Sequence, residues 1–396
     1  MNSITCSQDA GLYIHIPFCV RKCPYCDFYS VAELSLKSRF LKALLREMEL
    51  VSHEGLRFDT LYIGGGTPSI YEYNHVGQMV AASFQNFDFQ PDSEITMEVN
   101  PGTVSFEQLK GYREAGINRI NIGVQSFQQK SLAFLGRIHT EHEAHRVIKD
   151  ALRAGFENIG FDLIYGLPDQ SKADWLEDMK QAVESDPPHL SCYMLTYEKG
   201  TPLHNDLLAG RVRSLADDRM RALFETTIEF LEDHGYFQYE TSNFARIGND
   251  GKPHVSKHNL KYWTLAPYIG LGPSAHSFIE PRRYWNVSNV DEYIAAIESG
   301  RLPTADGEIL SREKQLIEAI YLGLRMTGGI DLVGFKAKYG IDFVKTFKEI
   351  ISDLEKQNYI GIKNSRCALT QRGRAFADSI ASLFVARDLS DADVKS

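Results

Sequence analysis

Apolar residues in the first half of the chain fall into short runs that alternate with longer stretches where they recur every three or four positions. The short runs, which are typical of buried strands, read LYIHI, TLYIGG, SEITMEV, RINIGVQ, NIGFDLIYG and HLSCYMLT. The helical spacing is clearest over residues 35–53, where Phe40, Leu44, Met48 and Val51 form one stripe. This order predicts six βα units and a parallel sheet covered by helices, either an open doubly wound sheet or a barrel.

The pattern changes after about residue 302. Before this point a seventh segment, YFQYETSNFA, is predicted to add to the sheet. Beyond it the sequence predicts three helices, a hairpin and a last helix, over residues 312–326, 331–338, 342–357, 359–370 and 371–383. We therefore predict two domains, residues 1–302 and 303–396.

Helices followed by a two-stranded wing are also typical of winged-helix domains that read DNA. Acidic residues such as Glu349, Asp353 and Glu355 lie on the helix that would have to face the phosphates. The formal net charge of -9 also argues against a nucleic-acid surface, which needs clustered Lys and Arg. We therefore interpret the second domain as a structural or lid domain.

The composition is that of an ordinary globular protein. Hydrophobic residues make up 43% of the 396 residues and charged residues 24%, which is enough to build a core without disulfides. The N-terminal segment has no basic stretch followed by an apolar one, and nowhere do eighteen apolar residues run together. We expect a cytoplasmic protein with no stable membrane insertion.

Residues that can carry chemistry recur where the predicted strands end. In βα architectures the ligand binds at the C-terminal edge of the strands. The polar or glycine-rich segments found there are the cysteine loop after the first strand, then 64–68, 98–101, 125–127, Asp162 with 165–168, and Thr196. They predict a single site at one mouth of the sheet.

The loop after the first predicted strand reads CVRKCPYC and contains Cys19, Cys23 and Cys26. Cysteine thiolates hold iron–sulfur clusters, and a four-iron cube needs four ligands, so three cysteines leave one iron open. Structural zinc is the alternative, but it requires four ligands, usually from paired cysteine knuckles. We interpret the loop as a [4Fe-4S] site whose open iron binds S-adenosylmethionine (SAM), the source of a carbon radical on reduction.

The other cysteines are scattered, and we expect no disulfides in a cytoplasmic protein. Cys192 lies in a strand-like run and Cys367 in the predicted hairpin, so both are interpreted as small buried hydrophobic residues, while Cys6 lies near the N-terminus.

Three further features gain meaning only beside the cysteines. The turn of Gly64, Gly65 and Gly66 can offer its backbone to the methionyl end of SAM, but it can equally be a sharp strand-to-helix turn. Glu98 on its own is more often a solvated or capping carboxylate. Asp162 lies inside an apolar run, where a buried carboxylate needs a partner.

The motifs CxxxCxxC, GGGTP, EVNPG, GINRINIGVQSF, LGRIH, DLIYGLP and SNFA together resemble those of the radical-SAM family that contains coproporphyrinogen III dehydrogenases and haem chaperones. The resemblance covers nearly the whole chain. It implies an α/β fold, a radical-SAM partial (β/α)6 TIM-like barrel, followed by a small, mainly helical, winged-helix-like C-terminal domain.

The chain is more similar to the chaperone branch of this family. Phe28 stands where the enzyme branch has a fourth cysteine. The enzyme branch also has a longer N-terminal arm, whereas only twelve residues precede Tyr13 here. Residues 258–263 read HNLKYW, which is similar to the HNxxYW signature of the chaperone branch.

The resemblance also implies roles for single residues. Those expected to contact SAM are Tyr13, Gly65, Gly66, Thr67 and Glu98. Those that match residues holding a second SAM in the enzyme are Tyr25, Gln125, Arg137 and Asp162. His258 becomes the candidate axial ligand of haem, although spacing alone would make it an ordinary hydrogen-bonded side chain. Ser256 stands where many relatives have cysteine, which removes a thiolate from haem attachment at that position.

Two functions follow as expectations. The first is a haem chaperone that binds haem and passes it to an acceptor protein, with a [4Fe-4S] cluster, SAM and an electron donor protein. The second is the radical oxidative decarboxylation of coproporphyrinogen. Phe28 and the HNLKYW segment favour the first, without dehydrogenase activity, so no residue is assigned as catalytic. An adaptor or DNA-binding role is disfavoured by the acidic balance of charge.

Overall fold

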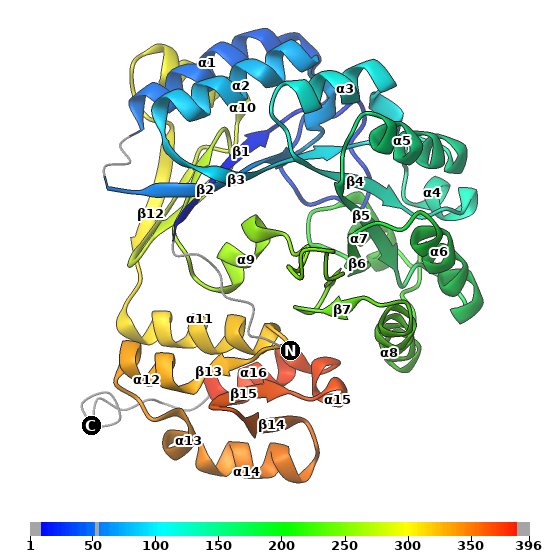
Figure 1. Ribbon diagram of the computed structural model, residues 1–396, viewed down its shortest axis with the longest axis vertical. Helices are drawn as coiled ribbons and strands as arrows, with labels where there is room; N and C mark the ends of the chain where they lie inside the picture. The colour runs from blue at the N-terminus through cyan, green and yellow to red at the C-terminus, as the bar shows by residue number, and fades with distance from the viewer. Residues whose placement is uncertain (1–8, 52–54, 386–396) are drawn as a thin grey trace.

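The computed structural model describes residues 9–51 and 55–385 (Figure 1). Six parallel strands are hydrogen bonded in the order of the sequence, as the six apolar runs predict. Their bounds are β1 Ala10–Ile16, β2 Arg57–Gly65, β3 Asp88–Val99, β4 Arg119–Gln125, β5 Asn158–Tyr165 and β6 His189–Met194. The predicted α/β class is therefore confirmed.

Helices follow the strands and cover the outer face of the curved sheet (Figure 1). Ser105, Thr140 and Ser171 begin three of them with a capping box, in which the side chain accepts from a backbone N–H of the first turn. The helices are α1 Lys37–Leu50, α2 Tyr73–Asn86, α3 Phe106–Glu114, α4 Gln129–Phe134, α5 Glu141–Arg153, α6 Lys172–Glu184, α7 Pro202–Leu208 and α8 Asp217–Asp233, with short 3-10 turns at Leu34–Leu36, Pro68–Ile70 and Pro101–Thr103. The helix predicted over residues 35–53 is α1, which buries Phe40, Leu44 and Met48.

The sheet extends beyond the six parallel strands at both edges. At one edge the predicted seventh segment forms β7 Phe237–Gln238 and β8 Asn243–Ala245, which pairs antiparallel with β6. At the other edge four strands that the sequence did not predict join β1, in the order β9 Tyr268–Leu271, β10 His276–Ile279, β11 Arg282–Asn286 and β12 Thr304–Ile309. Helix α10 Val290–Glu298 packs against α1 outside this edge.

A short helix, α9 Lys257–Trp263, lies on the inner side of the curved sheet (Figure 1). It contacts β1 and β2, the central strands, and it also contacts the C-terminal helix α11. The interior of the partial barrel is therefore filled in part by this helix, which carries the HNLKYW segment.

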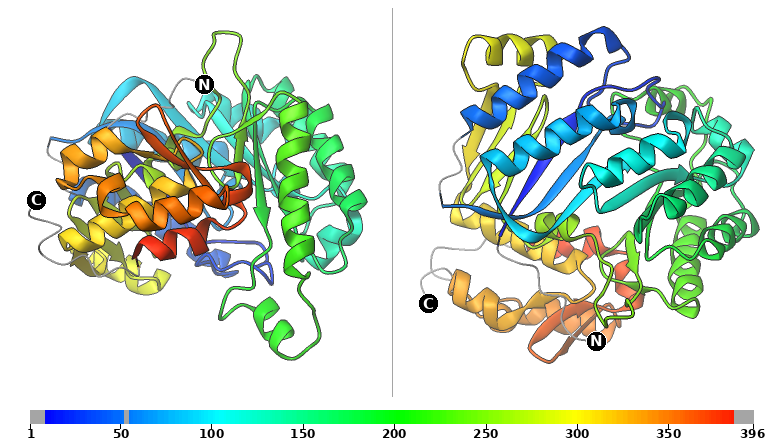
Figure 2. Two further views of the ribbon diagram at one scale, coloured as in Figure 1. Left: turned by 90° about the horizontal axis from the view of Figure 1, so that it is seen from below. Right: turned by 45° about the horizontal axis from the view of Figure 1, so that its top comes forward.

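The C-terminal elements lie together below the barrel in the right view of Figure 2. They surround their own cluster of buried side chains, which begins at Leu316 and ends at Phe384. Their bounds are α11 Arg312–Arg325, β13 Ile330–Asp331, α12 Leu332–Tyr339, α13 Phe343–Thr346, α14 Lys348–Lys356, β14 Ile360–Lys363, β15 Arg366–Leu369, α15 Gln371–Arg374 and α16 Ala377–Val385. The predicted helix 342–357 is two helices, because Phe347 leaves the helical conformation between them. The boundary at residue 302 stays a prediction; β12 beyond it still pairs with β11.

Two cysteine predictions are confirmed, and one lies outside the described residues. Cys192 in β6 and Cys367 in β15 are buried and unpaired, while Cys6 is not among the described residues. Within the described part of the chain, no helix combines the length and the apolar character needed to cross a membrane.

Candidate functional site

The cysteine loop leaves the end of β1 and is closed at its base by backbone hydrogen bonds. Val31 N donates to Pro17 O at 2.8 Å, and Cys19 N donates to Val31 O at 3.0 Å. Cys19 is buried, whereas Cys23 and Cys26 are partly exposed, and all three thiols are free of disulfides. The fold thus presents three thiols on one short loop at the C-terminal edge of the strands.

Each of the three thiols has a distinct environment. Thr67 Oγ1 donates to Cys19 Sγ at 3.4 Å, and Arg137 Nη1 donates to Cys23 Sγ at 3.7 Å. Burial raises the pKa of Cys26 to about 11, and the neighbouring Cys23 and Cys19 add to the shift.

The donor set fits an iron–sulfur cluster better than a single ion. Among the described residues, no three His, Cys, Asp or Glu side chains converge tightly enough to hold one metal ion. A four-iron cluster does not need such convergence, because each cysteine binds a different iron. The other described cysteines are buried in β6 and β15, so the loop offers three thiolates and no fourth.

The glycine turn at the end of β2 is fastened to the cysteine loop. Gly66 N donates to Ile16 O at 2.7 Å, and Thr67 N donates to Phe18 O at 2.8 Å. A Cβ on Gly66 would come within 2.6 Å of Phe18 O, so only glycine permits this approach. The N–H groups of the turn are therefore engaged within the protein, contrary to the expectation that they are open to a ligand.

Glu98, near the end of β3, lies beside this turn. Tyr62 Oη donates to Glu98 Oε1 at 2.8 Å, and Gly65 N donates to Glu98 Oε2 at 3.2 Å. Burial raises the pKa of the Glu98 carboxyl to about 7, although these two hydrogen bonds lower it. Glu98 is thus a positioned carboxyl that ionises near neutrality, not a solvated one.

A second group of predicted residues gathers over Gly123 in β4. A Cβ on Gly123 would lie 3.0 Å from the Gln125 amide nitrogen and 3.3 Å from Arg137 Nη2, so both side chains cross this glycine. Arg137 Nη2 donates to Gly123 O at 2.9 Å. Gln125 has a φ of 67°, a left-handed conformation that non-glycine residues rarely adopt and that often marks a functional site.

Tyr25 and Asp162 complete this second group. Tyr25 of the cysteine loop hydrogen bonds to Arg137, while burial raises the pKa of its hydroxyl. Asn121 Nδ2 donates to Asp162 Oδ2 at 2.5 Å, and the other oxygen of Asp162 is buried without a partner among the described residues. Burial raises the pKa of Asp162, as expected for a carboxyl inside an apolar strand.

His258 lies apart from the cysteine loop. It contacts Gly11 and Thr60, and Glu94 accepts from its backbone N–H at 3.2 Å, so it lies beside the first halves of β1 and β2 and the middle of β3. Tyr62 connects the two regions, because its ring stacks on His258 at 5.1 Å and its hydroxyl donates to Glu98. Tyr13 lies between them as well, with its ring 6.3 Å from His258 and its hydroxyl bonded to His15.

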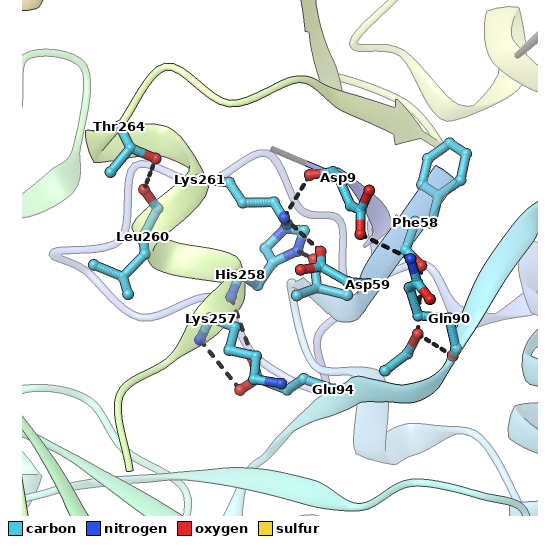
Figure 3. Close-up of polar contacts among 12 residues, drawn as sticks. Asp9, Phe58, Asp59, Gln90, Glu94, Lys257, His258, Leu260, Lys261 and Thr264 are labelled. Carbon is cyan, nitrogen blue, oxygen red and sulfur yellow. Dashed lines mark hydrogen bonds and ion pairs between the residues drawn. The ribbon is translucent and has the colours of Figure 1, made fainter. Parts of the chain in front are cut away.

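Sequence reasoning missed the polar residues that support His258. Figure 3 shows Lys261 reaching the backbone oxygen of Asp9 at 2.6 Å and the Asp59 carboxylate at 2.5 Å. It also shows Glu94 receiving the backbone N–H groups of Lys257 and His258. The available signal was weak: polar residues alternate with apolar ones in β2 and β3, which marks one face of each strand.

Comparison with known proteins gives a consistent answer along the chain. The profile of the radical SAM superfamily matches residues 13–182, and that of the HemN C-terminal domain matches residues 310–376. The heme chaperone HemW of Lactococcus lactis is 33% identical over 379 residues, covering 96% of this chain and 98% of the relative. The heme chaperone HemW of Escherichia coli is 35% identical, covering 95% and 98%.

A solved structure extends the comparison to the fold. Coproporphyrinogen III oxidase (HemN) from Escherichia coli aligns with a TM-score of 0.80 at 22% identity, covering 96% of this chain and 90% of that one. The fold of the barrel and of the C-terminal domain is therefore shared with that radical SAM enzyme.

Proposed function

Because the chain belongs to the HemW family of radical SAM proteins, we propose that it is a haem chaperone, which binds haem and passes it to an acceptor protein. The observation that carries this proposal is the similarity to heme chaperones over 96% of this chain and 98% of the relative. A second observation agrees: Phe28 is 66% exposed beside the cysteine loop, where the enzyme branch has a cysteine.

Cys19, Cys23 and Cys26 are proposed to hold a [4Fe-4S] cluster, which an electron donor protein reduces. When bound, the cluster with SAM on its open iron supplies one-electron chemistry at the sulfonium. The residues proposed to bind SAM are Tyr13, Gly65, Gly66, Thr67 and Glu98. The ionised Glu98 carboxylate would bind a positively charged amino group. Because the pKa of Glu98 is raised to about 7, such a positive partner would favour the ionised form of the carboxyl near neutral pH.

The second group, Tyr25, Gln125, Arg137 and Asp162, is proposed to bind a second SAM. Arg137 reaches both Cys23 and Gly123, so its cation lies between the cysteine loop and β4. The strained backbone of Gln125 and the unpaired oxygen of Asp162 are the features expected of residues that await a ligand.

His258 is proposed to be the axial ligand of haem, in a barrel that also holds the cluster. The aromatic rings of Tyr13, Tyr62 and Tyr262 surround it and would offer an apolar wall to a porphyrin. The residues 303–396 are proposed to form the second domain, which shields the open side of the barrel.

Coproporphyrinogen decarboxylation is the other candidate function, because Tyr25, Gln125, Arg137 and Asp162 match residues that hold a second SAM in the enzyme. The two functions separate in one experiment on anaerobically reconstituted protein. Haemin is titrated and followed by its Soret band, and coproporphyrinogen turnover is assayed under reducing conditions with SAM. We expect saturable haemin binding and no protoporphyrinogen. Turnover without haemin binding would reverse the choice.

The axial ligand is tested in the same titration with three variants. His258→Ala should lose the Soret shift, whereas His254→Ala and His276→Ala should retain it. His276 is the stricter control, because it is an exposed histidine that stacks on an aromatic ring, Trp285, at 5.5 Å. Loss of binding in a control variant alone would move the axial assignment to that residue.

A further inference from the structure

Both ring nitrogens of His258 already have partners inside the protein. Nδ1 lies 2.8 Å from Thr60 Oγ1, and Nε2 lies 2.9 Å from Tyr262 Oη. His258 is only 1% exposed. A metal can therefore bind this imidazole only where one of the two partners withdraws.

The two hydrogen bonds are not equivalent in chemical terms. A phenol O–H is a better donor and a poorer acceptor than an aliphatic hydroxyl. The favoured arrangement has Tyr262 donating to Nε2, while Nδ1–H donates to Thr60 Oγ1. The partner of one ring nitrogen sets the tautomer, so Nε2 carries the lone pair.

The two partners also differ in their freedom to move. Thr60 is fully buried in β2, a central strand of the sheet. Tyr262 is only partly buried, at the C-terminal half of α9, where its ring meets Tyr268 edge-on at 4.7 Å. Tyr262 is thus the partner that can leave, and Thr60 is the one that stays.

The imidazole itself is held in place from every other side. Its ring stacks on Tyr62 at 5.1 Å with an interplanar angle of 26°. A Cβ on Gly11 would come within 3.0 Å of the ring, so glycine leaves the space that the ring fills. The backbone N–H of His258 is fixed by Glu94, as Figure 3 shows, and Lys261 of the same helix is fixed by Asp59.

We propose that Tyr262 is a positioning residue for haem capture: its hydroxyl keeps Nε2 of His258 unprotonated and covered until haem iron takes the place of the hydroxyl. Thr60 then remains on Nδ1, as the hydrogen-bonded outer partner that a metal-binding histidine usually has. The exchange needs movement of the Tyr262 side chain but not of His258. This inference rests on the proposed function, in which His258 binds haem.

The test compares haemin affinities of Tyr262→Phe, Tyr268→Phe and wild type by Soret titration. Phenylalanine removes the competing hydrogen bond, whose net contribution corresponds to roughly a three- to tenfold change in an equilibrium constant. We expect Tyr262→Phe to bind haemin about that much more tightly with the wild-type Soret position. Tyr268→Phe, a neighbour without a bond to His258, should bind like wild type. An unchanged or weaker affinity of Tyr262→Phe would overturn the proposal.

The outer partner is tested with Thr60→Val and Thr60→Ser. Valine removes the acceptor for Nδ1–H and should weaken haemin binding several-fold and change the Soret spectrum, whereas serine should restore both. Equal behaviour of valine and serine would mean that Thr60 only fills space, and the assigned role of Thr60 would be wrong.

A measurement without haem separates this proposal from the proposed function. Nitrogen NMR of protein labelled at histidine should show His258 with its proton on Nδ1 and a bare Nε2. A proton on Nε2 would overturn the positioning role of Tyr262 whatever the haem result. If His258→Ala binds haemin like wild type, the axial assignment fails; if His258→Ala loses binding and Tyr262→Phe is unchanged, only the present inference fails.

Discussion

The three thiols of the cysteine loop do not lie in equivalent surroundings. Cys19 is buried and accepts from Thr67, Cys23 is partly exposed and accepts from Arg137, and the pKa of Cys26 is raised to about 11 by burial. Binding to iron requires thiolates, and Arg137 places a cation 3.7 Å from the Cys23 sulfur.

We predict that anaerobically reconstituted protein holds one [4Fe-4S] cluster and that Cys23→Ser loses it. The visible charge-transfer absorbance and the iron content report the loss. Cys192→Ala is the matched control, because Cys192 is buried in β6 and lies outside the cysteine loop. A cluster that survives in the triple Cys→Ser variant would contradict the assignment of the loop.

Glu98 should impose a pH dependence on both stability and SAM binding. Its pKa is raised from 4.5 to about 7 in the folded protein, so the folded state holds the proton more tightly than the unfolded chain. Stability should therefore fall as pH rises from about 4.5 to 7, by roughly 1–3 kcal/mol. Glu98→Gln removes this loss.

Urea unfolding of wild type and Glu98→Gln at pH 5 and pH 8 measures the effect. The variant should gain stability relative to wild type only at pH 8. The difference between the two proteins isolates Glu98 from Glu47, whose pKa is also raised to about 7 by burial. SAM affinity of wild type should rise as pH increases through about 7. A SAM affinity that is flat with pH in wild type would show that the carboxylate does not bind the ligand.

Some functional residues could be predicted from the sequence, and others could not. The cysteines could be predicted because their spacing is local and their chemistry is specific. Lys261 and Arg119, which is 1% exposed on β4, could not be recognised as interior residues, because a lone basic residue in a sequence is normally at the surface. The engaged nitrogens of His258 depend on Thr60, a contact across 198 positions that no local pattern encodes.

Strand β2 organises the interior through its inward face. Thr60, Tyr62 and Gly64 occupy alternate positions along this face. Thr60 hydrogen bonds to His258, and Tyr62 hydrogen bonds to Glu98. Gly64 leaves space for the Glu98 carboxyl. The period of two in a strand makes this possible, since alternate side chains share a face. One strand therefore links the proposed haem and SAM regions.

Helices and strands whose apolar residues recur with a regular spacing were predicted well, whereas short elements were not. The six parallel strands and the helices between them are long enough for their apolar spacing to be read. Strands β9 to β12 are short, and β12 is mostly exposed and polar, so they carry little pattern. Helix α9 is likewise only 7 residues long, and its place inside the barrel depends on Asp59 and Glu94 from other strands.

We predict that Glu94 anchors α9 inside the barrel. It accepts from the backbone N–H groups of Lys257 and His258, two donors of the first helical turn that lack partners within the helix. Glu94→Ala should lower the free energy of unfolding by about 1–3 kcal/mol. Glu94→Gln, which keeps one acceptor oxygen, should lose less.

Hydrogen exchange measured by mass spectrometry locates this effect. Peptides covering α9 should exchange faster in Glu94→Ala, while those covering α5, on the outer face, should not change. Uniform acceleration over the whole chain would indicate a general loss of stability and would refute a local anchoring role.

One of the places where the barrel and the C-terminal elements meet is a group of residues next to α9. Arg325, at the end of α11, donates through Nε to Glu240 Oε2 at 2.8 Å and lies 4.2 Å above the ring of Trp263. Tyr239 and Met326 share the apolar cluster that packs beside them. Figure 1 shows α11 below α9, and the two helices are in contact. The helix that carries His258 is therefore held from both parts of the molecule.

The ion pair between Arg325 and Glu240 should stabilise this junction. Glu240 is fully buried, so Arg325→Ala would leave its carboxylate without its ion-pair partner, at a cost of about 3–5 kcal/mol. Replacing both, as Arg325→Met with Glu240→Gln, should recover much of the loss because no lone charge remains. Arg46→Ala breaks an exposed pair with Glu49 and should cost under about 1 kcal/mol. Thermal and urea unfolding measure all three. The double variant could instead be as unstable as Arg325→Ala. In that case the packing of Arg325 on Trp263, rather than its ion pair with the buried Glu240, would be the interaction that stabilises the junction.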